Sequence, residues 1–413
     1  MRYLRAFTEL GVDARYLIAA STVRSVTSMG ILGVLLNLYV IRLGYGPAFI
    51  GLLNGLAIVA AAGASPVAGG LGRRWGARRT MLTGLGIGAV GGLLLPFADL
   101  LPEDLIPGWL VVANSVAFSG GMLFYVNLTP YLGVVTAPRE RSAAFSVRFS
   151  LQWLGSGLGS MIGGVLPGAF AFLVGESLSG PGPYRYSLLF GAVLSLAAVL
   201  FLLRGREVSA ETDGGRSGSA GPTPWRLLIL VGLVSLMLTP AEAAAWVFFN
   251  AYADTILRAT TSQIGLTVAA AQFLGVPVAL TMPAVASRLG TGRAAATAAF
   301  GIALSLLPVA LIPHFAAAGL GYVGILACGA ILAPALNVYL TEIASSEWLS
   351  SATGASLLGT TVSFALAAFG GGYLITILGY REFFIIAAAL TVAGVLVFRV
   401  TLLRASASSN VEG

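Results

Sequence analysis

Two ionisable side chains lie inside long apolar segments, where the cost of burying a charge makes a functional role the first hypothesis. Arg24 falls near the middle of the first apolar segment, and Glu242 falls somewhat beyond the middle of the seventh. A carboxylic acid can carry a proton if it is neutral in one conformation and ionised in another, and burial favours its neutral form. A guanidinium can bind an anion. Glu242 is therefore a candidate proton carrier, and Arg24 a candidate anchor for an anionic substrate.

Each of these residues also has a structural interpretation. Arg24 and Glu242 could neutralise each other, or Arg24 could extend its charge to cytoplasmic lipid headgroups. A third arginine, Arg148, lies near one end of the fifth apolar segment, where the same extension or pairing with a loop is expected. Both interpretations stay open at this stage.

Amide side chains inside the apolar segments offer a donor and an acceptor to a polar substrate. The same groups can join helices to one another. Asn37 and Asn250 share a repeated Asn-x-Tyr context, which favours packing. The candidate substrate residues are Gln152, Gln272, Asn127 and Asn337.

The residues that metal binding, disulfide formation, ATP binding or nucleophilic catalysis would require are missing from the sequence. The chain has one histidine, His314, and one cysteine, Cys328, so neither a metal cluster nor a disulfide framework is expected. All 23 basic residues are arginine, and without lysine no Gly-x-x-x-x-Gly-Lys-Ser/Thr phosphate loop exists. No nucleophile–base pair is evident. We therefore expect neither an enzyme nor a cofactor, and no ATP-driven pump.

The composition indicates where these residues lie. Hydrophobic residues make up 57% of the 413, charged residues 9%, and the mean hydropathy is +0.91. A soluble domain carries about 25% charged residues because its surface must be hydrated. The apolar stretches are continuous, so the prediction is an all-α integral membrane protein in a lipid bilayer.

Twelve segments are long enough to span a bilayer. Their approximate bounds are 15–41, 49–71, 80–100, 107–136, 142–174, 186–203, 226–252, 262–287, 294–313, 318–344, 351–377 and 382–403. The segment 204–225 is rich in Gly, Ser and charged residues, which predicts a flexible linker. The predicted domains are therefore two six-helix bundles, 1–203 and 226–413, with a cytoplasmic linker between them.

The two predicted bundles resemble each other. Short matches recur in the same order in both, which indicates a tandem duplication of six helices and a pseudo-symmetric pair of halves. The matches are Asn37-Leu-Tyr39 with Asn250-Ala-Tyr252, Ile50-Gly-Leu52 with Ile264-Gly-Leu266, Arg74-Trp-Gly76 with Arg288-Leu-Gly290, and Gly163-Gly164 with Gly370-Gly371.

The arginines also predict the orientation. With both termini in the cytoplasm, only Arg42, Arg185, Arg258 and Arg381 fall on the outer side, and most of the others fall in cytoplasmic segments. Positively charged loops stay inside, so both termini are predicted to be cytoplasmic and the protein to lie in the cell membrane (inner or plasma membrane). The arginines are spread over short loops, so nucleic acid is not an expected partner. A monomer is expected.

The segment Gly69–Arg79, between the second and third spans, carries a family resemblance. It reads Gly-Gly-Leu-Gly-Arg-Arg-Trp-Gly-Ala-Arg-Arg, and it is similar to the Gly-x-Leu-Ala-Asp-Arg-x-Gly-Arg-Arg loop of the major facilitator superfamily. The gating-loop candidates are Gly69, Arg73, Arg74, Gly76, Arg78 and Arg79. Arg73 stands where the family has Asp, so its latch chemistry must differ, or Arg73 must find an acceptor such as Glu140. A tight glycine turn with arginines that obey the positive-inside rule is the alternative.

A second motif lies in the fifth span. Gly155, Gly159, Gly163 and Gly164 resemble the Gly-x-x-x-Gly-Pro-x-x-Gly-Gly motif of proton-driven exporters, with Ser160 in place of Pro. Glycines four apart also form a smooth stripe for close helix packing, which is the general interpretation.

The resemblance covers essentially the whole chain and implies a secondary transporter that works by alternating access, similar to the drug/proton antiporter-like branch. Its partners would be a small-molecule substrate and a proton as the coupling ion. The leading hypothesis is proton-coupled export of a small amphipathic or drug-like solute. The alternative is uptake of a small polar or anionic metabolite by symport.

Overall fold

The computed structural model describes residues 10–207, 223–345 and 347–403. Over these residues the chain forms helices and no strands, and twelve helical spans are long and apolar enough to cross a membrane. Their bounds follow the predicted segments within a few residues, from Val12–Arg42 to Tyr380–Thr401. The predicted all-α membrane fold with twelve spans is therefore confirmed.

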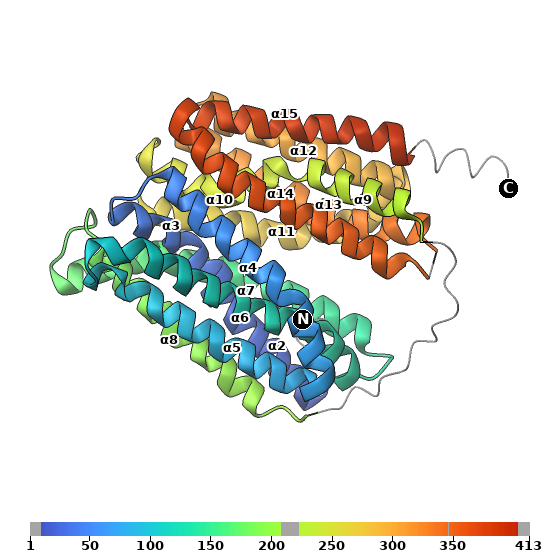
Figure 1. Ribbon diagram of the computed structural model, residues 1–413, viewed down its shortest axis with the longest axis horizontal. Coiled ribbons are helices and arrows are strands. Elements are labelled where there is room, and N and C mark those ends of the chain that lie inside the picture. The colour runs from blue at the N-terminus through green and yellow to red at the C-terminus, as the bar shows by residue number, and fades with distance from the viewer. Residues whose placement is uncertain (1–9, 208–222, 346, 404–413) are drawn as a thin grey trace. The chain divides into compact units, whose positions relative to one another are not determined.

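The helices of the first six spans belong to the first of two compact units (Figure 1). Span one is built from three pieces, and spans three and four each carry a short 3₁₀ turn at one end. The bounds are α2 Val12–Arg24, η1 Ser25–Leu32, α3 Gly33–Arg42, α4 Pro47–Trp75, α5 Ala77–Leu94, η2 Leu95–Leu100, η3 Glu103–Leu105, α6 Ile106–Val135, α7 Arg141–Val174 and α8 Gly182–Leu203.

The second unit contains the other six spans. Span seven is built from two helices, α9 Trp225–Leu238 and α10 Pro240–Thr255. The remaining bounds are α11 Thr261–Leu289, α12 Thr291–Leu311, α13 Phe315–Ile343, α14 Leu349–Leu378, α15 Tyr380–Phe398 and η4 Arg399–Leu403. Short pieces are exchanged between the units: Pro47–Gly51 groups with the second and Thr260–Ala269 with the first. The bundle bounds 1–203 and 226–413 stay predictions, and linker residues 208–222 lie outside the described residues.

The main helix contacts of the two units correspond. In the first unit α5 packs most extensively on α6, α7 on η1, and α5 on α8. The corresponding pairs of the second unit, α12 with α13, α14 with α9, and α12 with α15, also have extensive contacts (Figure 1). The repeated glycines also share one backbone conformation, φ 93° at Gly76 and φ 80° at Gly290, and each begins the next helix. These similarities are what a six-helix duplication predicts.

Span one changes from α-helix to π-helix at Ser25, directly after Arg24. The local sequence Ser21-Thr-Val-Arg-Ser25-Val-Thr27 is rich in hydroxyl groups, and these donate to carbonyls three or four residues earlier, as from Ser25 to Ser21 (2.9 Å). Such bonds compete with the helical ladder and often bend a helix. They also satisfy backbone oxygens where water is absent. The break in span one therefore follows from its own sequence.

Span seven is interrupted at Thr239 and Pro240. Pro240 has no N–H to continue the helical ladder, so α9 ends at Leu238 and α10 begins at Pro240. The freed N–H of Ala241 donates to the Thr391 hydroxyl of α15 (3.0 Å). The neighbouring helix thus replaces the missing bond, which makes a broken helix tolerable inside a membrane.

The surfaces of several spans are apolar as well as exposed. Phe172 in α7 is 88% exposed and Leu320 in α13 is 73% exposed. Exposed side chains of this kind would be unfavourable in water. They are the side chains that a lipid-facing surface requires.

The two ends of α7 provide a test of the predicted orientation. In a Cys328→Ala background, Ser179→Cys, which lies beyond the carboxyl end of α7, should react with a membrane-impermeant maleimide in intact cells. Ala137→Cys, which lies before its amino end, should react only after the membrane is opened. Both side chains are exposed, so accessibility in the folded protein is equal. The reverse pattern would show that the termini lie outside.

Candidate functional site

Glu242 lies at the break in span seven. It is the third residue of α10, in the first turn, where the amino end of a helix favours a negative charge. Thr239-Pro-Ala-Glu242 has the pattern of a capping box, but the Thr239 hydroxyl donates instead to the carbonyl of Ser235 (3.0 Å). The Glu242 carboxylate is therefore not committed to capping its own helix.

The carboxylate of Glu242 faces α13. A Cβ placed on Gly329 would lie 3.1 Å from Oε1, so the missing side chain of Gly329 leaves room for the carboxylate. Tyr322 lies two turns from Gly329 on α13 and interacts electrostatically with the Glu242 carboxylate. Its ring stacks on that of Phe249, with the ring centroids 4.0 Å apart. Among the described residues, no arginine and no hydrogen-bond donor pairs with Glu242.

Arg24 is the last residue of α2, at the break in span one. Its guanidinium lies over the ring of Tyr125 (5.3 Å to the centroid) and beside that of Phe124 (5.8 Å). The guanidinium fills space left by Gly88 in α5 and Gly121 in α6, where a Cβ on Gly121 would overlap it. No described acid of the first unit forms an ion pair with Arg24. Whether it pairs with Glu242 stays a prediction.

Arg148 is buried, contrary to the expectation that it extends to headgroups or pairs with a loop. Its side chain is 6% exposed, donates to Gln152 Oε1 (2.9 Å) and lies over the Phe149 ring (4.5 Å to the centroid). Arg148 and Gln152 are one helical turn apart, so the amide can reach the guanidinium. The i, i+4 spacing of Arg148 and Gln152 is the feature of the sequence that could have predicted this contact. The position of Arg148 near a helix end led instead to the expectation of extension to headgroups or pairing with a loop.

Asn127 has a helix-joining contact. Its amide donates to the carbonyl of Ala68 in α4 and to that of Leu123 in α6, both at 3.0 Å. Both amide protons are therefore used by the backbone, and Gly72 of α4 provides the space for the side chain. This geometry favours packing over substrate binding. Asn37 is similar, since it accepts from Asn54 (3.0 Å), as its repeated context predicts.

The other two amides lie in the second unit. Gln272 is buried in α11, where it has interactions of its own. Asn337 is exposed on α13 and makes no hydrogen bond to the described residues, so its amide is open to a ligand. Their roles in substrate binding stay predictions.

The predicted loop Gly69–Arg79 is mostly helical, which corrects its expected extent. Helix α4 continues to Trp75, and α5 begins at Ala77, so the turn is a single residue, Gly76. Its φ of 93° and ψ of 147° form a conformation that is essentially restricted to glycine. The chain can reverse direction in one residue only because this position has no side chain.

An acid from outside the motif supplies the negative charge that the family has in Asp and that Arg73 cannot provide. Glu207, which follows α8, lies over Gly76 with its carboxylate 3.8 Å from Arg78 and 3.7 Å from Arg79. Arg78 also donates to the carbonyls of Leu202 (3.1 Å) and Leu203 (2.6 Å), which are among the last of α8.

Arg73 and Arg74 are exposed in the last turn of α4, and the described residues give neither of them an ion pair. The suggested pairing of Arg73 with Glu140 is therefore absent from the described structure, and Glu207 with Arg78 and Arg79 takes its place.

The glycine stripe of α7 packs on span one. Gly155 lies against Thr22 and Val26, Gly159 against the carbonyl of Val26, and Gly163 against Ile31. Gly164 faces the segment Thr260–Ala269 at Gly265, and Ser262 donates to its carbonyl (3.1 Å). The general interpretation of the stripe, close helix packing, is what the contacts show.

Comparison with known proteins decides the family. A sequence model described as Major Facilitator Superfamily matches residues 18–333. The chain belongs to the Major Facilitator Superfamily. The resemblance drawn from Gly69–Arg79 is thereby confirmed, and the family and fold are those of membrane transporters.

Individual relatives are distant. The multidrug resistance protein MdtH of Yersinia enterocolitica (serotype O:8 / biotype 1B) is 24% identical over 352 residues, which cover 81% of this chain and 80% of MdtH. Solved structures with the same fold include a POT family transporter in complex with 5-aminolevulinic acid (TM-score 0.73, 13% identity, 96% and 98% of the two chains). The nucleoside transporter NupG (0.69, 18%, 94% and 98%) and the xylose transporter XylE from E. coli, inward open (0.70, 12%, 94% and 94%), also match.

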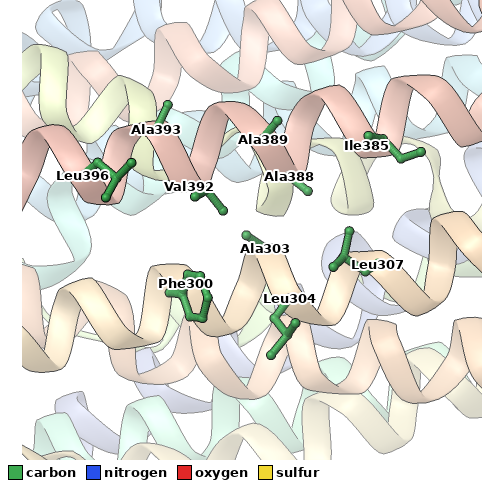
Figure 2. Close-up of a pocket in the computed structure, with 10 residues that line it drawn as sticks. All are labelled: Phe300, Ala303, Leu304, Leu307, Ile385, Ala388, Ala389, Val392, Ala393 and Leu396. Atoms are coloured by element: carbon green, nitrogen blue, oxygen red, sulfur yellow. The ribbon is translucent and has the colours of Figure 1, made fainter.

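One groove of this superfamily member lies away from these polar residues. It lies between α12 and α15 and has a volume of about 430 Å³. The residues along it, drawn in Figure 2, are all apolar. Its walls include Phe300, Leu304, Ile385 and Leu396. A substrate site needs a few polar groups that fix the ligand's orientation. This groove has no polar side chain in its lining, so we assign the candidate site to the polar residues described above.

The packing of the glycine stripe can be tested within one helix. Gly159→Ala should lower the stability of the purified transporter by about 1–3 kcal/mol, because the added methyl group overlaps the backbone of Val26. Gly168→Ala is the matched control, since a Cβ there has nothing within 4 Å. Thermal unfolding in detergent should separate the two variants. Equal melting temperatures would contradict close packing at Gly159.

Proposed function

We propose that this protein is a secondary active transporter that couples the movement of a small amphipathic solute to a proton, and that Glu242 carries the proton. The observation that supports this most directly is an acid at a helix break with no described cationic partner. A carboxylate that is held by an arginine would stay ionised. Glu242 can change its protonation state when its surroundings change.

The position of Glu242 suits this role. Because α9 and α10 are separate helices, α10 and its first turn can move without carrying the whole span. Broken helices near the middle of the membrane form the substrate and ion sites of many secondary transporters. Span one is also broken, directly at Arg24. The breaks lie at corresponding places in the two repeats, with Arg24 just before the break in span one and Glu242 just after the break in span seven.

Export is the direction that we propose. The relative MdtH is described as a multidrug resistance protein, and the glycine stripe of α7 is similar to the exporter motif. Uptake by symport is the second candidate, which the unneutralised arginine Arg24 favours because it would bind an anionic metabolite. Flux measured against and along an imposed pH gradient distinguishes the two directions.

We further propose that the turn at Gly76 controls the rate of conformational exchange rather than substrate affinity. Glu207, Arg78 and Arg79 connect the amino end of α5 to the carboxyl end of α8. The contact therefore ties together two helices of the first unit at their ends, and neither Arg24 nor Arg148 takes part in it.

The coupling proposal can be tested with Glu242→Gln, which resembles the permanently protonated acid with almost no change in volume. In proteoliposomes, pH-driven accumulation of a transported amphipathic dye should be lost, because no proton can be released. Dye binding and dye exchange without a gradient should persist.

Glu382→Gln is the control for Glu242→Gln. Glu382 also lies in the first turn of a helix, α15, but its side chain is exposed, so its removal should leave driven transport intact. If Glu242→Gln retains full pH-driven flux, then the proton is carried elsewhere or the driving ion is not a proton.

The proposal that the Gly76 turn controls the exchange rate can be tested with a matched pair of variants, one at each glycine turn. Gly76→Ala and Gly290→Ala should each destabilise the protein by about 1–3 kcal/mol, since both backbones require glycine. Only Gly76→Ala also displaces Glu207, because nothing lies within 4 Å of a Cβ on Gly290. Transport should therefore be slowed by Gly76→Ala and by Glu207→Gln with unchanged ligand affinity. A loss of affinity would instead place this turn in the binding site.

A further inference from the structure

The first unit holds two arginines inside membrane spans, and none of the described acids of this unit neutralises either of them. Arg24 is the last residue of α2, and Arg148 is the eighth residue of α7. The ion pairs described in this unit are Glu207 with Arg78 and Arg79, and Asp99 with Arg185, all near helix ends. A charge in a membrane span is almost always paired. Two unpaired charges of the same sign therefore need an explanation.

One side chain, Tyr125 of α6, connects the two arginines. The guanidinium of Arg24 lies 5.3 Å from its ring centroid, and Arg148 interacts electrostatically with its hydroxyl group. The contact of Gln152 with Met29 brings α7 next to η1, directly after Arg24 in the chain. The two cations thus belong to a single cluster built from three spans.

The cluster contains donors without acceptors. Nε of Arg24, Nε of Arg148 and the hydroxyl oxygen of Tyr125 are buried, and none has a hydrogen-bond partner. The amide of Gln152 uses its oxygen for Arg148, while its nitrogen meets only the sulfur of Met29 at 3.8 Å, a weak acceptor. Leaving a buried donor unsatisfied is costly, more so for a charged group. The missing acceptors are what an anionic oxygen group supplies.

The surroundings of this cluster are apolar and partly open. Phe124, Phe149 and the Tyr125 ring lie beside the guanidinium groups, and the contact between Gln152 and Met29 is exposed. A ligand that enters beside Gln152 would direct one end toward these donors and place an apolar body against aromatic rings. Arginine suits this task, because its fork of donors matches carboxylate and phosphate oxygens.

We propose that Arg24, Tyr125, Arg148 and Gln152 form the recognition site for the anionic group of the transported solute. The substrate class is a small amphipathic anion, a carboxylate or a phosphate ester with an aromatic or aliphatic body. This inference rests on the proposed transport function and specifies its substrate. The role of Gln152 predicted from the sequence is thereby joined to Arg148, for which the sequence analysis expected extension to headgroups or pairing with a loop.

The test uses the purified full-length protein and two anionic probes, benzoate and phenyl phosphate. Both should raise the melting temperature in a concentration-dependent manner, because a ligand that binds only the folded state stabilises it. Benzyl alcohol and benzylamine, of similar size without an anionic group, should not. Arg24→Gln and Arg148→Gln should each weaken probe binding about tenfold or more, equivalent to about 1.4 kcal/mol.

Two further variants separate recognition from folding. Arg141→Gln removes the same charge from an exposed position of the same helix, so it should leave probe affinity unchanged. Tyr125→Phe retains the ring under Arg24 and removes only the hydroxyl group. It should fold normally and weaken binding of both anions.

The outcomes are distinct from those of the coupling experiment. If neither anion stabilises the wild-type protein, or if both arginine variants bind as the wild type does, the anion site is wrong, whatever the flux results show. If the anions bind and both arginine variants lose them, the site stands even when Glu242→Gln leaves pH-driven flux intact. Equal stabilisation by benzyl alcohol would also overturn it, because the site would then recognise the ring alone.

Discussion

The absence of water in the bilayer core is the constraint on which this structure depends. Each backbone N–H and C=O in a span must find a partner inside the protein, so the spans are helices. Where a helix is interrupted, a side chain replaces the lost bond. Serine and threonine hydroxyls do this in span one, and Thr391 does it for Ala241 in span seven. The interruptions are therefore local and well satisfied, and each places an ionisable residue at its edge.

Charge follows a second rule, because a cation in a span is costly unless something compensates it. Arg78 and Arg79 at a helix end have Glu207 and terminal carbonyls. Arg24 and Arg148 have aromatic faces and an amide. Aromatic rings attract a guanidinium but provide no oxygen acceptors. This contrast distinguishes Arg78 and Arg79, which stabilise the fold, from Arg24 and Arg148, which can bind an anionic ligand.

The sequence was sufficient for the architecture and insufficient for the contacts. Continuous apolar segments predict twelve spans because length and hydropathy are local properties, and the observed bounds agree closely. The burial of Arg148 and the helix-joining role of Asn127 depend on which face a helix turns to its neighbours, and segment positions do not contain that information. The partner of the arginine motif could not be predicted either, since Glu207 lies far away in the chain and falls within the predicted linker 204–225.

The position of Glu207 has an evolutionary consequence. A duplicated pair of six-helix repeats begins with two equivalent glycine turns, and the turns at Gly76 and Gly290 still share their backbone shape. The connecting segment after α8, however, is present once, and its acid contacts only the first turn. The glycine of the turn is kept in both copies, whereas Arg78, which pairs with Glu207, corresponds to Gly292 in the second copy. Within the described residues, an acid of the joining segment restrains the first turn, whereas the second turn has a contact of its own, from the Thr291 hydroxyl to the Glu342 carboxylate. The two copies therefore keep one turn geometry under different restraints.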